Sequence, residues 1–174
     1  MRVATIVHQG RNRVGRLTPD GLHVDLFDID ATHGAQALIE RGAAALPVIS
    51  SRVSLAQARL IAPLPRPRRN LWCVGRNYHA HAKELRETVF KDNAADPQAW
   101  PIVFTKVPEC VIGPDAEVRL PGAAISSQID YEAELAVIIG RGGRNIARAD
   151  AMGHVFGYTI VNDVTTRDVQ MRHQ

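Results

Sequence analysis

The fold is decided by one stretch of the sequence, Ile129-Asp130-Tyr131-Glu132-Ala133-Glu134-Leu135-Ala136-Val137-Ile138-Ile139. Side chains alternate between the two faces of a β-strand, so a strand here places Asp130, Glu132 and Glu134 on one face. Past the glutamates both faces turn apolar, which is typical of a buried strand. The stretch therefore predicts one long strand that carries carboxylates onto a partly buried face.

Carboxylates in this arrangement indicate a site for a hard divalent cation. Two carboxylates about 7 Å apart on a partly buried face repel each other and lose hydration. A bound cation relieves both effects, and carboxylate oxygens suit Mg²⁺, Ca²⁺ or Mn²⁺. Asp163, inside the next apolar stretch, is a candidate third ligand for the same cation. The alternative is that the glutamates pair with arginine or lysine on a solvated sheet face.

A second candidate site lies in a predicted helix at residues 78–86, which Asn77 is placed to cap. His81 and Glu84 are three residues apart and therefore share a helix face. A carboxylate beside an imidazole orients it and raises its basicity, which is how a general base that activates water is built. The alternative is an ordinary surface ion pair.

The chain divides at a proline-rich stretch. Residues 1–62 read as a small β-rich N-terminal domain, with strands at 3–7, 14–17 and 22–26 and a helix near 33–46. Prolines alternate through residues 63–69, which favours an extended linker. Residues 70–174 read as a second domain with strands at 71–74, 102–107, 129–139 and 158–165 and short helices at 147–152 and from 167. The predicted class is α+β with a dominant sheet, and Trp72 and Trp100 are expected in its core.

Net charge and cysteine content exclude few classes of protein. A net charge of +3 gives no argument for nucleic acid or membrane as a partner. Cys73 and Cys110 have no CxxC partner, so we expect free buried thiols in a cytoplasmic protein. The chain stops inside a predicted helix without a polar or glycine stop signal, which leads us to expect a C-terminally truncated protein.

Taken jointly, four segments resemble the fumarylacetoacetate hydrolase family, in particular its bacterial acylpyruvate hydrolase and 5-carboxymethyl-2-hydroxymuconate isomerase members. They occur in the family's order and spacing within residues 60–174. The matching segments are Cys73-Val74-Gly75-Arg76-Asn77-Tyr78 with His81 and Glu84, Pro101-Ile102-Val103-Phe104-Thr105-Lys106, Ile129 to Leu135, and Asn162-Asp163-Val164-Thr165-Thr166-Arg167-Asp168.

The resemblance implies roles for the candidate residues. Glu132, Glu134 and Asp163 match the family's magnesium or manganese ligands. His81 and Glu84 match the dyad that positions and deprotonates water.

Three further residues match the substrate pocket. Lys106 corresponds to a basic pocket position, and Arg76 and Tyr78 lie near it. The implied fold is a mixed β-roll in a homodimer, with more pocket residues, including a lysine, beyond position 174.

The implied substrates are small 2-oxo acids, in pathways such as aromatic-compound catabolism. Hydrolytic C–C cleavage of an acylpyruvate such as fumarylpyruvate is the first expectation. The alternatives are a 2-oxo-acid decarboxylase or a muconate-type isomerase or hydratase on the same site, or a non-catalytic fragment. The chemistry is consistent, because a metal bound to the carboxylate and keto oxygens stabilises an enolate.

Overall fold

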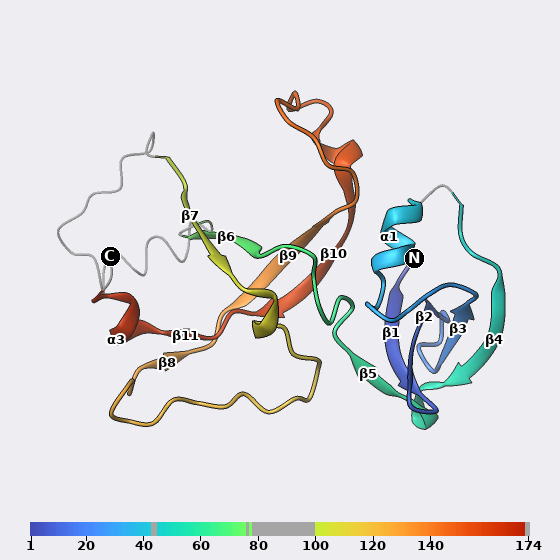
Figure 1. Cartoon of the computed structure of the whole chain (residues 1–174), viewed down its shortest axis with the longest axis horizontal. Helices are drawn as coiled ribbons and strands as arrows, with labels where there is room; N and C mark the ends of the chain where they lie inside the picture. Colours follow the sequence, from blue (N-terminus) through green and yellow to red (C-terminus); the bar gives the residue numbers. More distant parts are fainter. Residues whose placement is uncertain (43–44, 76, 78–99, 173–174) are drawn as a thin grey trace.

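The computed structural model describes residues 1–42, 45–75, 77 and 100–172 (Figure 1). Within them, strands dominate and helices are short, as the α+β prediction requires. The first 61 residues contribute a five-stranded antiparallel sheet, and the later strands form three two-stranded ladders. No helix in this part of the chain is long and apolar enough to span a membrane.

The N-terminal sheet has the strand order β4-β3-β2-β1-β5. Its strands are β1 (Val3–His8), β2 (Arg11–Leu17), β3 (His23–Phe27), β4 (Ile49–Ser54) and β5 (Arg59–Ile61). The three strands predicted for residues 3–26 are confirmed, whereas β4 and β5 were not predicted. The expected helix is shorter than its prediction: α1 spans Gln36–Arg41, because Gly42 takes a φ of 82° that no helix continues through.

Almost all fully buried side chains belong to this N-terminal unit. Among the described residues, every apolar side chain classed as buried lies between positions 4 and 62. Ile6, Val24 and Leu26 form the centre of one cluster. A second cluster includes Val14 and Ile39. Ile138 and Phe156, from strands described below, pack against this second cluster and so join the two parts of the chain.

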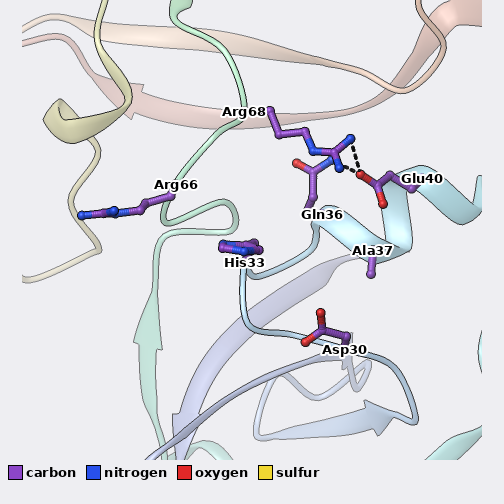
Figure 2. Close-up of a pocket in the computed structure, with 7 residues that line it drawn as sticks. All are labelled: Asp30, His33, Gln36, Ala37, Glu40, Arg66 and Arg68. Carbon is purple, nitrogen blue, oxygen red and sulfur yellow. Dashed lines mark hydrogen bonds and ion pairs between the residues drawn. The ribbon is translucent and has the colours of Figure 1, made fainter.

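The proline-rich connector, residues 63–69, contacts the N-terminal unit. The carbonyl oxygen of Pro63 accepts hydrogen bonds from the backbone N–H of Ala35 and the hydroxyl of Thr5, both at 2.9 Å. Arg68 forms an ion pair with Glu40 of α1 at 2.7 Å. Figure 2 shows this pair at the edge of a pocket of about 380 Å³ between α1 and the connector.

The second part of the chain is built from paired strands. β6 (Leu71–Gly75) pairs with β7 (Ile102–Lys106), and β9 (Ala133–Ile139) pairs with β10 (Val155–Asn162). β8 (Ile129–Asp130) pairs with β11 (Thr165–Thr166), and α3 (Arg167–Gln170) follows directly. The prediction of a helix at residues 147–152 is wrong. That region holds turns and a short 3-10 helix, Ala151–His154, inside the β9–β10 connection.

The prediction of one unbroken strand over 129–139 is also wrong, because β8 and β9 are separated at Tyr131 and Glu132. The backbone N–H of Glu132 donates to the side-chain oxygen of Asn162 at 3.2 Å, so a side chain replaces a ladder partner there. The register is the same on both sides of the break, since Asp130 pairs with Thr165 and Ala133 with Asn162.

One face of the β9–β10 ladder is exposed, which corrects the expectation of a strand buried on both faces. Leu135, Val137 and Ile160 are 52, 47 and 73% exposed. Trp72 and Trp100, expected in the core, are exposed as well. The described residues leave this face of the ladder largely uncovered, so alternation predicted the faces correctly but not their burial.

Candidate active site

The predicted carboxylates meet at the break in the hairpin. The common register places Glu132 opposite Asp163, and the backbone N–H of Asp163 donates to the carbonyl oxygen of Glu132 at 2.8 Å. Opposed residues of an antiparallel pair point to the same face. Glu134 is two residues further along β9 and shares that face. The side chains of Glu132 and Asp163 are only 17 and 12% exposed, so both charges are largely removed from water.

Lys106 supplies the positive charge next to Asp163. Its Nζ forms a short ion pair with Asp163 Oδ1 and donates a hydrogen bond to the carbonyl oxygen of Val164 at 3.2 Å. Lys106 ends β7, so the β6–β7 ladder brings this amine to the hairpin. The structure therefore joins a residue predicted for substrate binding to one predicted as a metal ligand.

Arg167 forms an ion pair with Glu132, the acid opposite Asp163. One terminal nitrogen of its guanidinium lies 2.9 Å from Glu132 Oε2 and 2.8 Å from Asp130 Oδ2, and its Nε donates to Asp130 at 2.9 Å. The Thr165 hydroxyl donates to Glu132 Oε1 at 2.8 Å. Burial alone would lower the pKa of Arg167, but the bonds to Asp130 and Glu132 outweigh it and leave that pKa raised. Both oxygens of Glu132 are thus fixed.

Sequence reasoning missed the role of Arg167, although the residue stands in one of the segments that carry the family resemblance. A signal was available: three acids on one strand face need compensating charge, and Arg167 follows the strand that opposes them. The alternative of acids paired with arginine or lysine is realised for Glu132 and Asp163, on a half-buried face and not a solvated one.

Asp168 accepts hydrogen bonds from the residues that precede β8. Its carboxylate accepts from the buried hydroxyl of Ser126 at 2.5 Å and from the backbone N–H of Ser127 at 3.1 Å. These bonds, with the Ser126 hydroxyl first, lower the pKa of Asp168. The backbone N–H of Arg167 also donates to the carbonyl of Gln128 at 2.8 Å. The start of α3 is therefore tied to the residues that precede β8.

Cys73, in β6, borders the carboxylates. Burial raises the pKa of its thiol, and the negative charge of Asp163 adds to that effect. A thiol held protonated in this way is a poor nucleophile. Both cysteines are free, as predicted, although Cys110 is exposed and Cys73 only half-buried.

The donors suit a hard cation by their chemistry, since Glu132, Glu134 and Asp163 offer only carboxylate oxygens on one strand face. Among the described residues, no three His, Cys, Asp or Glu side chains converge as a ready metal-binding group. Glu132 is turned toward Arg167 and Asp163 toward Lys106. The residues fit such a cation once Asp163 exchanges its ion pair with Lys106 for the metal, and the ligand assignment stays a prediction.

The remaining predicted site residues fall outside the described part of the chain. They are His81 and Glu84 of the predicted dyad, and Arg76 and Tyr78 of the predicted pocket.

The family model described as "Fumarylacetoacetate (FAA) hydrolase C-terminal" matches residues 70–174, and the chain belongs to this family, which confirms the resemblance.

Among curated relatives, the chain is similar to oxaloacetate tautomerase YisK of Bacillus subtilis, with 46% identity over 121 residues (70% of this chain and 38% of the relative). It is 42% identical over 158 residues to the mitochondrial oxaloacetate tautomerase FAHD2A of Homo sapiens, covering 87% of this chain and 47% of the relative. The chain therefore spans half or less of the length of these relatives.

Solved structures agree on the fold. Fumarylacetoacetate hydrolase from Exiguobacterium antarcticum matches with a TM-score of 0.74 and 34% identity, over 99% of this chain and 59% of that one. A 5-carboxymethyl-2-hydroxymuconate delta-isomerase from Mycobacterium smegmatis matches with a TM-score of 0.73 and 27% identity, over 99 and 58%.

Proposed function

We propose that this chain supplies the metal-binding part of an enzyme that forms and reprotonates the enolate of a small 2-oxo acid, with tautomerisation of an oxaloacetate-like acid as the reaction. The observation that carries the proposal is the opposed pair Glu132 and Asp163, which are largely buried and each paired with a cationic side chain. Two relatives named oxaloacetate tautomerase support the choice of reaction.

Glu132, Glu134 and Asp163 would hold Mg²⁺ or Mn²⁺. When bound, such a cation acts as a Lewis acid toward negative charge on an oxygen of the substrate. The chain's own residues have separate tasks: Arg167 and Thr165 keep the Glu132 carboxylate in one orientation.

Keto–enol exchange moves one proton from the carbon next to the ketone to the ketone oxygen. We assign that transfer to His81 oriented by Glu84, the pair to which the family resemblance gives the task of deprotonating water. The Lys106 ammonium is the group we assign to an anionic oxygen of the substrate, because a lysine side chain is a point charge on a flexible stem.

Hydrolytic cleavage of an acylpyruvate such as fumarylpyruvate is the second candidate. The observation that favours it is the similarity to a protein named fumarylacetoacetate hydrolase, at 34% identity. In that reaction His81 takes its proton from water, which then attacks the distal carbonyl.

Two ultraviolet assays on the 174-residue chain separate these candidates. We expect Mg²⁺- or Mn²⁺-dependent acceleration of oxaloacetate keto–enol exchange, and loss of that acceleration in Glu132→Gln. The exposed Glu117→Gln is the matched control and keeps the rate. Turnover of fumarylpyruvate without acceleration of tautomerisation would replace the first candidate by the second. Inactivity toward both acids would contradict an enzymatic role for this chain.

A further inference from the structure

The two acids at the break in the hairpin are neutralised in different ways. Arg167 contacts Glu132 and Asp130 with a planar fork, and Thr165 adds a third group to the same assembly. Asp163 is paired with Lys106, whose ammonium comes from a separate ladder and has a flexible stem. Glu132 is therefore held in one orientation by Arg167 and Thr165. Asp163 is held by the Lys106 ammonium, which can move away on its flexible stem.

In the part of the chain that the structure describes, these pairs bring together more acids than cations. Three carboxylates, Asp130, Glu132 and Asp163, pair with two described side-chain cations, Lys106 and Arg167. Glu134 adds a fourth carboxylate on the same face of the hairpin. An excess of negative charge on side chains that are partly removed from water favours the uptake of another cation.

We propose that Lys106 is an internal placeholder for the divalent cation: its ammonium occupies Asp163 until the metal binds, and metal binding displaces it from Asp163 and from the Val164 carbonyl. This inference rests on the proposed metal site. Asp163 Oδ1 is the atom at issue, because it cannot serve both cations with the same geometry. Arg167 stays in place during the exchange, since its bonds to Asp130 do not involve Asp163.

The first test compares Mn²⁺ affinities, read from the paramagnetic resonance signal of free Mn²⁺. Lys106→Met removes the competing charge and keeps most of the apolar stem, so we expect Mn²⁺ to bind about 10-fold more tightly than to the wild type. Arg144→Met removes an exposed arginine from the β9–β10 connection and should leave the affinity unchanged. Unchanged or weaker binding by Lys106→Met would overturn the proposal.

The second test uses the wild-type chain and does not depend on the folding of a variant. Acetic anhydride modifies accessible lysine amines, and mass spectrometry of the peptide containing Lys106 gives its rate of modification. We expect Mn²⁺ to increase that rate several-fold, because the displaced amine loses its two partners. A rate that Mn²⁺ leaves unchanged or lowers would overturn the exchange.

The two proposals fail in different ways. A wild-type chain that binds no Mn²⁺ refutes the metal site itself. A chain that binds Mn²⁺ while Lys106 stays equally protected, or while Lys106→Met binds no better, refutes only the placeholder role.

Discussion

Glu132 and Asp163 occupy opposed positions of one antiparallel hairpin, and the backbone N–H of Asp163 donates to the carbonyl of Glu132 at 2.8 Å. The strand break at this point follows from Asn162, whose side-chain oxygen takes the N–H of Glu132. Here the irregularity coincides with the two acids whose charges the site must compensate.

Loss of Arg167 should destabilise the fold. Arg167→Met leaves the half-buried carboxylates of Glu132 and Asp130 without their shared partner, so we expect the free energy of unfolding to fall by about 1–3 kcal/mol. Urea denaturation followed by circular dichroism measures the change. Arg144→Met, on an exposed turn, should change it by less than about 0.5 kcal/mol. Equal stabilities for the two variants would show that Arg167 does not clamp these acids.

Acid should weaken the N-terminal sheet through Asp25. This buried carboxylate accepts from Arg52 at 2.6 Å and from Arg16 at 3.2 Å, and the hydrogen bond from Arg52, followed by that from Arg16, lowers its pKa against the opposing effect of burial. Because the pKa is lower in the folded chain, the stabilisation is complete above the unfolded-state pKa. It is lost as the pH falls through the folded-state value.

The corresponding measurement is urea denaturation between about pH 7 and about pH 3, spanning the range in which aspartates titrate. Asp25→Asn should be less stable than the wild type at the upper end and lose less stability on acidification. Asp150→Asn, at an exposed position, should follow the wild-type curve. Parallel curves for wild type and Asp25→Asn would contradict the assignment.

A methyl group at Gly34 should disrupt the junction between the connector and the N-terminal unit. Gly34 has a φ of 66°, and an added Cβ would meet the Pro63 carbonyl oxygen and lie 2.6 Å from Cδ of Pro65. We expect Gly34→Ala to cost about 2–4 kcal/mol, from the left-handed conformation together with the backbone shift.

Two other glycines separate these contributions. Gly10 has a φ of 72° but no atom within 4 Å of an added Cβ, so Gly10→Ala should cost only about 1–2 kcal/mol. Gly142 has open space and no such conformation, so its alanine variant should be close to neutral. Thermal unfolding would contradict this account if Gly34→Ala were no worse than Gly10→Ala.

Short-range sequence signals predicted the parts of the fold that depend on local pattern. Strand alternation located β1 and β3 and placed Asp130, Glu132 and Glu134 on one face, and the apolar run at residues 102–107 located β7. The break at Glu132 could not be predicted, because it depends on Asn162, a partner thirty residues away. The early end of α1 had a visible cause in Gly42, which the predicted helix ran through.

Burial was harder to predict than strand position. The apolar residues of β9 predicted a strand covered on both sides, yet Leu135 and Val137 lie on an exposed face. Alternation specifies which residues share a face but carries no information about what packs against it. The same limit explains why the carboxylates were predicted as a group while their cations, Lys106 and Arg167, were not assigned to them.

The most direct test of the central claim is a Mn²⁺ titration of the wild-type chain, Glu132→Gln and the control Glu117→Gln, read from the paramagnetic resonance signal of free Mn²⁺. If Glu132, Glu134 and Asp163 hold the cation, the wild type and Glu117→Gln bind Mn²⁺ equally, and Glu132→Gln binds at least about 10-fold more weakly. Equal binding by Glu132→Gln and wild type, or no binding by the wild type, would contradict the claim.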